Sequence, residues 1–226
     1  YISERSQTWT PSYSVVNVTD DTFEVEVYDA DTGNKLDGSS SYKIVKKDVV
    51  EAKDQKITAT ASYRKTETSK AFKLNAKTNG NGKLTYQTSN KSVAAVDAKG
   101  KVTVKAPGKI TITVKAAATD TYKAATKKIT ITVAPKKQRI ALNNKKAAQL
   151  TVKWNKNKKV SGYEFVYANN KSFKKAKTVR KANVTSYTVK KLKSGKTYYV
   201  KARAYKTVSG KRIYGAFSAV KKATIK

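Results

Sequence analysis

Histidine, cysteine and methionine are all missing from the 226 residues of this sequence. Without histidine and cysteine, the chain cannot form disulfides, zinc fingers, thiol nucleophiles or Ser-His-Asp triads. No apolar run approaches the roughly 18 residues that a membrane-spanning helix needs. We therefore expect no catalytic site, no metal, no cofactor and no membrane span in this chain.

Acidic residues are scarce, and they become scarcer along the chain. The protein has 49 basic and 15 acidic residues, which gives a formal net charge of +34. Residues 1–48 hold nine acids and five bases, and residues 49–134 hold five acids and seventeen bases. Residues 135–226 hold one acid, Glu164, against twenty-seven bases. This gradient predicts separate domains, the last of which would face an anionic partner.

Arginine is rare as well, because only six of the 49 basic residues are arginines. Sequence-specific DNA reading and bidentate phosphate binding favour arginine, whose planar fork matches those acceptors. Lysine spread over many strands gives a diffuse field that suits anionic cell-wall polymer or polysaccharide. Two other interpretations stay open: nucleic acid bound without sequence specificity, and a solvated surface that keeps strands from pairing edge to edge.

Apolar and polar residues alternate along most of the chain. The runs FEVEV at 23–27, ITITV at 110–114 and ITITV at 129–133 each place apolar side chains on one face. Such alternation is typical of antiparallel strands with one buried face. Similar runs recur about every eight to twelve residues between turn residues, which predicts an all-β chain of tandem antiparallel β-sandwiches.

Two short breaks divide these strands into domains. A charged stretch at 46–54 follows a strand expected to end near Val45. The stretch at 134–137 follows Val133, and its Pro135 cannot donate to a continuing ladder. The expected domains are residues 1–47, 48–134 and 135–226. The first would be a short N-terminal β-hairpin remnant, and the other two would be sandwiches.

The middle segment carries the run TSNKSVAAVDAKGKV at 88–102, followed by GKITITVKA at 108–116. These runs resemble the pattern of the bacterial Ig-like domain of group 2, with Thr88 where that family usually has serine. Asp97 and Gly100 would frame a tight turn between two of its strands. The resemblance implies a spacer or adhesive module of a surface or secreted bacterial protein.

The C-terminal segment carries QLTVKW at 149–154, VSGYEFVY at 160–167 and LKSGKTYYVKARAY at 192–205. Together these runs resemble a fibronectin type III domain. The resemblance implies structural roles for Trp154, Tyr163, Leu192 and Tyr198. Tyr198 would form the tyrosine corner, in which the hydroxyl bonds to the backbone near the preceding turn.

One face of this segment combines aromatic and basic side chains. Alternation turns Val200, Ala202 and Ala204 inward and leaves the intervening side chains outward. The candidate ligand-binding residues are these outward side chains and the bases that follow them: Tyr199, Lys201, Arg203, Tyr205, Lys206, Lys211 and Arg212. Aromatic and basic side chains together bind sugars and single strands. Cross-strand pairing on a solvent-facing sheet would give the same pattern.

Residues 1–47 are too few for a complete sandwich. PSYSVVNV at 11–18 and YDADTGNKLD at 28–37 resemble the last strands of bacterial calcineurin-like metallophosphoesterases. The resemblance implies a parent enzyme that hydrolyses phosphate esters with two metals. Its catalytic residues would lie upstream, since this chain has no histidine. Tyr1 is preceded by no initiator methionine or signal peptide, so we expect the interior or tail of a longer protein.

These observations predict a non-catalytic C-terminal accessory region of a secreted or surface-associated Gram-positive bacterial protein, placed outside the cell or on its surface. It would act as a spacer and bind anionic cell-wall polymer or polysaccharide. The alternative is an adhesin fragment that binds a host surface ligand, a glycan or matrix component, through the fibronectin type III face. An electrostatic tether should lose affinity steeply as salt rises, whereas an adhesin should keep its ligand.

Overall fold

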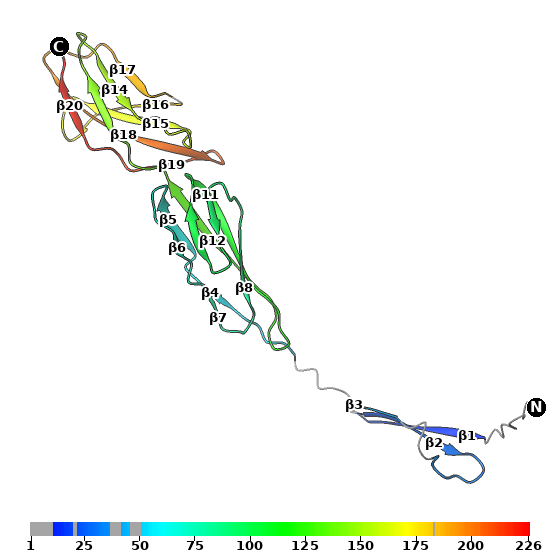
Figure 1. The fold of residues 1–226 in the computed structure, drawn as a ribbon. Helices are drawn as coiled ribbons and strands as arrows, with labels where there is room; N and C mark the ends of the chain where they lie inside the picture. The colour runs from blue at the N-terminus through cyan, green and yellow to red at the C-terminus, as the bar shows by residue number, and fades with distance from the viewer. Residues whose placement is uncertain (1–10, 20–21, 37–41, 46–50, 183) are drawn as a thin grey trace, which may run out of the picture. The chain divides into compact units, whose positions relative to one another are not determined.

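The structure is a computed structural model that describes residues 11–19, 22–36, 42–45, 51–182 and 184–226. It divides into two units, Tyr1–Glu51 and Ala52–Lys226. All regular secondary structure in the described residues is β-strand, arranged in several sheets (Figure 1), which confirms the all-β prediction. None of the described segments forms a helix with the length and apolar character needed to cross a membrane.

The first unit contains one three-stranded antiparallel sheet in the order β1-β2-β3. Its strands are β1 (Ser12–Val18), β2 (Thr22–Asp29) and β3 (Tyr42–Val45). The Asp29 carboxylate closes the turn after β2, because it accepts hydrogen bonds from the backbone N–H groups of Asp31 and Thr32 at 2.9 and 2.8 Å. These bonds lower the pKa of Asp29, those from Thr32 most. The predicted boundary between residues 47 and 48 lies outside the described residues.

The second unit begins with a sandwich whose sheets have the orders β5-β12-β11-β8 and β6-β10-β9, with a short β4-β7 pair. We refer to this sandwich as the Ig-like module. Its strands are β4 (Ile57–Thr58), β5 (Ser62–Thr66), β6 (Phe72–Lys73), β7 (Lys77–Thr78), β8 (Leu84–Thr88), β9 (Ala94–Val96), β10 (Lys101–Val104), β11 (Gly108–Ala116) and β12 (Ala125–Ala134). Its core includes Leu74, Val102, Ile112, Val114, Ile129 and Ile131, each at most 1% exposed.

The turn between β9 and β10 forms as the sequence predicts. Asp97 Oδ1 accepts the backbone N–H groups of Lys99 and Lys101, each at 2.9 Å. Gly100 adopts a positive φ of 73°, a left-handed conformation that favours glycine. These bonds, led by the one from Lys101, lower the pKa of Asp97.

One strand pair differs from the expected antiparallel arrangement. β5 runs parallel to β12, with Ser62 opposite Thr130 and Thr66 opposite Ala134. Alternation along a strand predicts which face is buried, but it carries no information about the direction of a neighbour that is distant in sequence.

A second sandwich follows Pro135, and we refer to it as the fibronectin module. Its sheets have the orders β13-β14-β17 and β16-β15-β18-β19, and β20 also pairs with β18. The strands are β13 (Ile140–Asn143), β14 (Leu150–Trp154), β15 (Gly162–Ala168), β16 (Lys177–Lys181), β17 (Ser186–Val189), β18 (Thr197–Val208), β19 (Lys211–Tyr214) and β20 (Lys221–Thr224).

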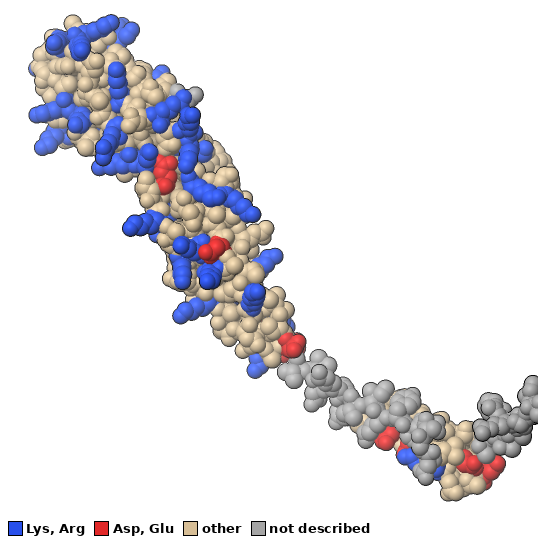
Figure 2. All heavy atoms as spheres, viewed as in Figure 1, with Lys and Arg blue, Asp and Glu red and all other residues tan. Residues whose placement is uncertain are grey.

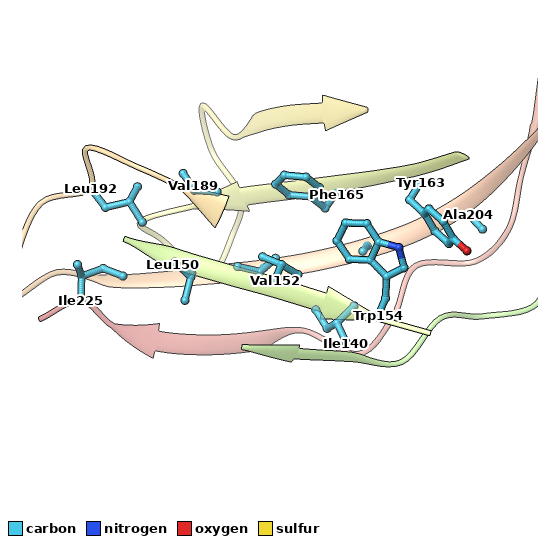
Figure 3. Packing of buried hydrophobic residues seen from close by; sticks show 12 residues of the cluster. Ile140, Leu150, Val152, Trp154, Tyr163, Phe165, Val189, Leu192, Ala204 and Ile225 are labelled. Atoms are coloured by element: carbon cyan, nitrogen blue, oxygen red, sulfur yellow. The ribbon is translucent and has the colours of Figure 1, made fainter. Parts of the chain in front are cut away.

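The core of the fibronectin module is built around aromatic rings (Figure 3). The Trp154 ring lies 5.2 Å from the Tyr163 ring and 6.1 Å from the Phe165 ring, measured between centroids. Trp154 Nε1 donates to the carbonyl of Val184 at 2.9 Å, so its polar atom is satisfied inside the core. Leu192 is 8% exposed at the edge of the same cluster.

Two tyrosine hydroxyls bond to backbone around this core. Asn157 N–H donates to Tyr163 Oη at 2.6 Å, and Lys193 N–H donates to Tyr198 Oη at 3.4 Å. The Tyr198 contact is the one that the fibronectin type III resemblance implies for a tyrosine corner.

Candidate functional site

The candidate site lies on the outer face of the larger sheet in the fibronectin module. β18 crosses the middle of this sheet, between β15 on one side and β19 and β20 on the other. Val200, Ala202 and Ala204 are buried at 0–1% exposure, whereas Lys201 and Arg203 are partly exposed. The alternation along β18 therefore turns Lys201 and Arg203 away from the core.

Glu164 forms a charged cluster at the centre of this face. Its side chain is 2% exposed, and it stands opposite Arg180 on β16 and Arg203 on β18. Arg180 Nε donates to Glu164 Oε2 at 2.7 Å, and Arg203 donates to Oε1 through Nε at 2.7 Å and Nη2 at 2.6 Å. Hydrogen bonds to the Tyr214 hydroxyl and to Glu164 raise the pKa of Arg180. The one acidic side chain of residues 135–226 is thus fully used inside the module.

Aromatic rings pack against the two central cationic side chains of β18, Lys201 and Arg203. The Arg203 guanidinium carbon lies 3.9 Å from the centroid of the Tyr214 ring and 4.3 Å from that of Phe217. Lys201 Nζ lies 4.2 Å from the centroid of Phe173 and 4.8 Å from that of Phe217. These cation–π contacts are internal, so Lys201 and Arg203 are positioned by their own module.

The interpretation of Tyr205 as an exposed ligand-binding ring is wrong, because this side chain is only 8% exposed. Tyr205 does lie on the outer face, but the Tyr214 ring packs against it at 5.9 Å and the Arg212 guanidinium lies 5.4 Å from its centroid. Gly162 provides the space beneath it, since a Cβ at Gly162 would lie 2.6 Å from Tyr205 Oη. The neighbouring strands therefore cover the ring.

The remaining predicted bases lie at or beside the hairpin that joins β18 to β19. Lys211 and Arg212 are exposed and Lys206 is partly exposed. The hairpin turn consists of Ser209 and Gly210, whose positive φ values of 47° and 74° match the twist of the flanking strands. This hairpin lies at the C-terminal end of β18. Tyr199 lies near the start of β18, where it pairs with Lys222 on β20.

Tyr199 lines a groove with residues that sequence analysis did not select. The groove has a volume of about 500 Å³ and is lined by Lys171, Tyr199, Val220 and Lys222. Val220 is 47% exposed, so the groove has an apolar lining residue beside its two lysines. The predicted seven residues thus separate into a Tyr199 groove, a central cluster at Lys201 and Arg203 that includes Tyr205, and a basic hairpin.

Lys and Arg side chains are spread over the visible surface of both modules of the second unit, where they outnumber Asp and Glu (Figure 2). Within the described ranges, no three His, Cys, Asp or Glu side chains gather closely enough to hold a metal ion. The arrangement offers an aromatic ring, a basic groove and a strong positive field. These features suit binding of an anionic chain by charge and by ring contact.

Comparison with known families identifies the two modules. The family described as "Intimin, immunoglobulin-like domain" matches residues 67–119, and "Fibronectin type III domain" matches residues 133–214. A Kelch domain-containing protein of Saccharolobus solfataricus is 39% identical over 80 residues, which are 35% of this chain and 11% of that protein. A Kelch domain-containing protein of Sulfurisphaera tokodaii is 37% identical over 84 residues, 37% of this chain and 11% of that protein. The chain thus spans about a tenth of the length of these relatives.

Solved structures similar to the chain include the FN1–FN3 domains of chicken CNTN1. The identity is 17%, with 91% of this chain and 78% of that chain covered, and the TM-score is 0.36. The sixth fibronectin type III domain of human fibronectin type III domain containing protein 3 is 19% identical, over 40% of this chain and 83% of that one, with a TM-score of 0.32. On the family matches, the chain contains an intimin-type Ig-like domain and a fibronectin type III domain.

Proposed function

We propose that this chain is a non-catalytic accessory region of a secreted or surface-associated bacterial protein, with an Ig-like spacer at 48–134 and a polyanion-binding fibronectin type III domain at 135–226. Ig-like and fibronectin type III domains are generally non-catalytic, and they fit an accessory or adhesin-like module of an extracellular or surface protein. The proposed ligand is an anionic cell-wall polymer or polysaccharide, and the proposed source is a Gram-positive bacterium.

The observation that carries this proposal is the position of Glu164. Residues 135–226 have twenty-seven basic side chains and this one acid, which is 2% exposed and held by two arginines. The surface of the fibronectin module therefore presents no acidic side chain to offset its lysines. A surface of one sign attracts polyanions and raises their association rate, and the attraction weakens with ionic strength.

The Tyr199 groove is the proposed contact for a single repeat of such a polymer. The Tyr199 ring, in a groove that Lys171 and Lys222 also line, can bind the face of a sugar while the ammonium groups bind its acidic substituents. Lys206, Lys211 and Arg212 would extend the same contact along the chain of the ligand. Lys201 and Arg203 contact aromatic rings of their own module, so they would contribute to binding through their positive charge.

The experiment is a binding titration of the whole chain with two immobilised polymers of equal length, a poly(glycerol phosphate) and a neutral glucan. We expect the chain to bind the anionic polymer and not the glucan. Replacing Tyr199 by alanine should weaken binding at least about five-fold, because one stacking contact is worth about 1–3 kcal/mol. Thr207→Ala, an exposed change on the same strand, serves as the control. Equal binding to both polymers would contradict the proposal.

A second candidate function is adhesion to a host glycan or matrix component. The intimin-type match over 67–119 and the apolar wall that Val220 gives to the Tyr199 groove favour this candidate. A defined host ligand would bind in moderate salt and would compete with the anionic polymer for the groove that contains Tyr199. Saturable binding to one neutral host glycan that is lost in the Tyr199→Ala variant would favour the adhesin function over the binding of an anionic polymer.

The proposed parent is a metallophosphoesterase, on the resemblance of residues 11–18 and 28–37. Its test is the coding sequence upstream of Tyr1. Asp, His and Asn motifs of a two-metal phosphoesterase would make this chain an accessory tail of that enzyme. Further Ig-like repeats without such motifs would contradict the enzyme parent.

A further inference from the structure

Arginine is concentrated at one place in a chain that otherwise uses lysine. Of the five arginines in the described residues, Arg64, Arg203 and Arg212 line one groove of about 520 Å³. Arg180 joins them through Glu164, which it shares with Arg203. Lysine would supply the same charge, so this clustering indicates a need for the guanidinium group, which presents donors in a rigid plane.

The groove is built from both modules of the second unit. Arg64 and Thr66 belong to β5 of the Ig-like module, whereas Arg212 and Tyr214 belong to β19 of the fibronectin module. Gly215 packs closely against the segment that joins the two modules, because a Cβ at this position would lie 2.5 Å from the Pro135 carbonyl oxygen.

Hydrogen bonds between the modules hold the two walls of the groove. Glu67 Oε1 accepts the backbone N–H of Lys136 at 2.9 Å and Nδ2 of Asn157 at 2.8 Å. Lys159 Nζ donates to the backbone carbonyl of Lys105 at 2.8 Å. Glu67 therefore links the Ig-like module to the segment after β12 and to the fibronectin module.

The charges in the groove are only partly neutralised. Glu164 offsets one of the two positive charges of Arg180 and Arg203, which leaves a surplus of one there. Arg64 and Arg212 form no ion pair with an acidic side chain anywhere in the described part of the chain. Both are exposed, so their donors are available to a ligand.

We infer that this groove binds a phosphate group, held by Arg64 from the Ig-like module and Arg212 from the fibronectin module. Guanidinium forks match phosphate oxygens in pairs, and such charge-assisted hydrogen bonds are stronger and more directional than a lysine contact. A phosphate bound by both walls would also fix one module against the other. The inference rests on the proposed polyanion binding, since it names the group on the polymer that is recognised.

The test compares the whole chain with its Arg64→Lys/Arg212→Lys variant, which keeps the net charge and removes only the guanidinium forks. Binding is titrated at a fixed ionic strength with poly(glycerol phosphate) and, separately, with inorganic phosphate. We expect the double variant to bind the polymer roughly tenfold more weakly, the equivalent of one charge-assisted bond. Arg139→Lys, outside this groove, is the matched control and should bind like the original protein.

The outcomes separate this inference from the proposed function. If the original chain and the double variant bind the polymer equally, the groove is not the phosphate site, although polyanion binding stands. A loss of equal size in Arg139→Lys would also overturn the inference. If the original chain fails to bind the polymer but binds inorganic phosphate in an Arg64- and Arg212-dependent way, the groove stands and its ligand is free phosphate. Binding to neither probe overturns both.

Discussion

Replacing Glu164 by glutamine removes the negative charge that joins three neighbouring strands of the fibronectin module. Glutamine has nearly the same shape and can still accept one hydrogen bond through its carbonyl oxygen. The change therefore isolates the loss of charge at a side chain that is 2% exposed, without opening a cavity. It leaves Arg180 and Arg203 facing each other across β15 with no anion between them.

The size of the effect follows from the exposure of the partners. Removing one member of a fully buried ion pair typically costs about 3–5 kcal/mol. Here the arginine side chains are 47% and 26% exposed, so both can regain water, and we expect a loss of about 2–3 kcal/mol. For a domain of this size, that loss corresponds to a decrease in Tm of roughly 10–20 °C.

Trp154 fluorescence in the whole chain measures this loss, because Trp154 lies in the core of the fibronectin module. The protein has two tryptophans, so both proteins compared carry Trp9→Phe. Urea unfolding is followed with and without about 1 M NaCl, where the Debye length is only about 3 Å. Ser194→Lys, at an exposed turn, raises the net charge by the same one unit and controls for general repulsion. A loss below about 0.5 kcal/mol, or one that disappears in high salt, would refute the buried cluster.

Three further changes test other parts of the account. Gly162→Ala should destabilise the fibronectin module by about 1–3 kcal/mol, since the new Cβ would lie 2.6 Å from both the Lys181 carbonyl oxygen and Tyr205 Oη; unchanged urea unfolding would show that this site has more room. The folded-state pKa of Asp97 is below its ordinary value of 3.8, so the ionised side chain stabilises the fold fully above that pH, and this stabilisation is lost as pH falls through the lower pKa. Asp97→Asn should therefore make the stability of the Ig-like module depend less on pH below about pH 4. An unaltered acid-unfolding profile would contradict this. Burial raises the pKa of Tyr163 above 10.0, so its neutral form stabilises the fold below that pH, and stability falls as pH rises through the raised pKa. Absorbance titration should show Tyr163 ionising at a higher pH than an exposed tyrosine. Ionisation at about pH 10 would be the contrary result.

The parts of the fold that depend on local pattern could be predicted from the sequence. Alternation gave the buried faces of β11 and β12, and Asp97 with Gly100 gave the turn between β9 and β10. Trp154 and Tyr163 were expected to be structural because the runs around them resemble a fibronectin type III domain, and both lie in the core of that module. These features need only the residues that lie near one another along the chain.

The candidate site could be predicted only in part, because its contacts depend on strand register. Glu164 is conspicuous in the sequence as a lone acid, but its partners follow from the pairing of β15 with both β16 and β18. The burial of Tyr205 depends on Tyr214, which a hairpin folds back over it. The groove lined by Arg64 and Arg212 could not be predicted from the sequence, since it joins residues from two modules.

The dependence of polymer affinity on salt tests the central claim most directly. The dissociation constant of the whole chain for poly(glycerol phosphate) would be measured between about 50 and 200 mM salt. Each neutralised phosphate on a single flexible chain contributes roughly −0.7 to the slope of log affinity against log salt. A cationic tether that contacts several phosphates predicts a slope of about −3 or steeper. A slope near zero, with affinity retained in high salt, would contradict the account and favour recognition of a defined ligand.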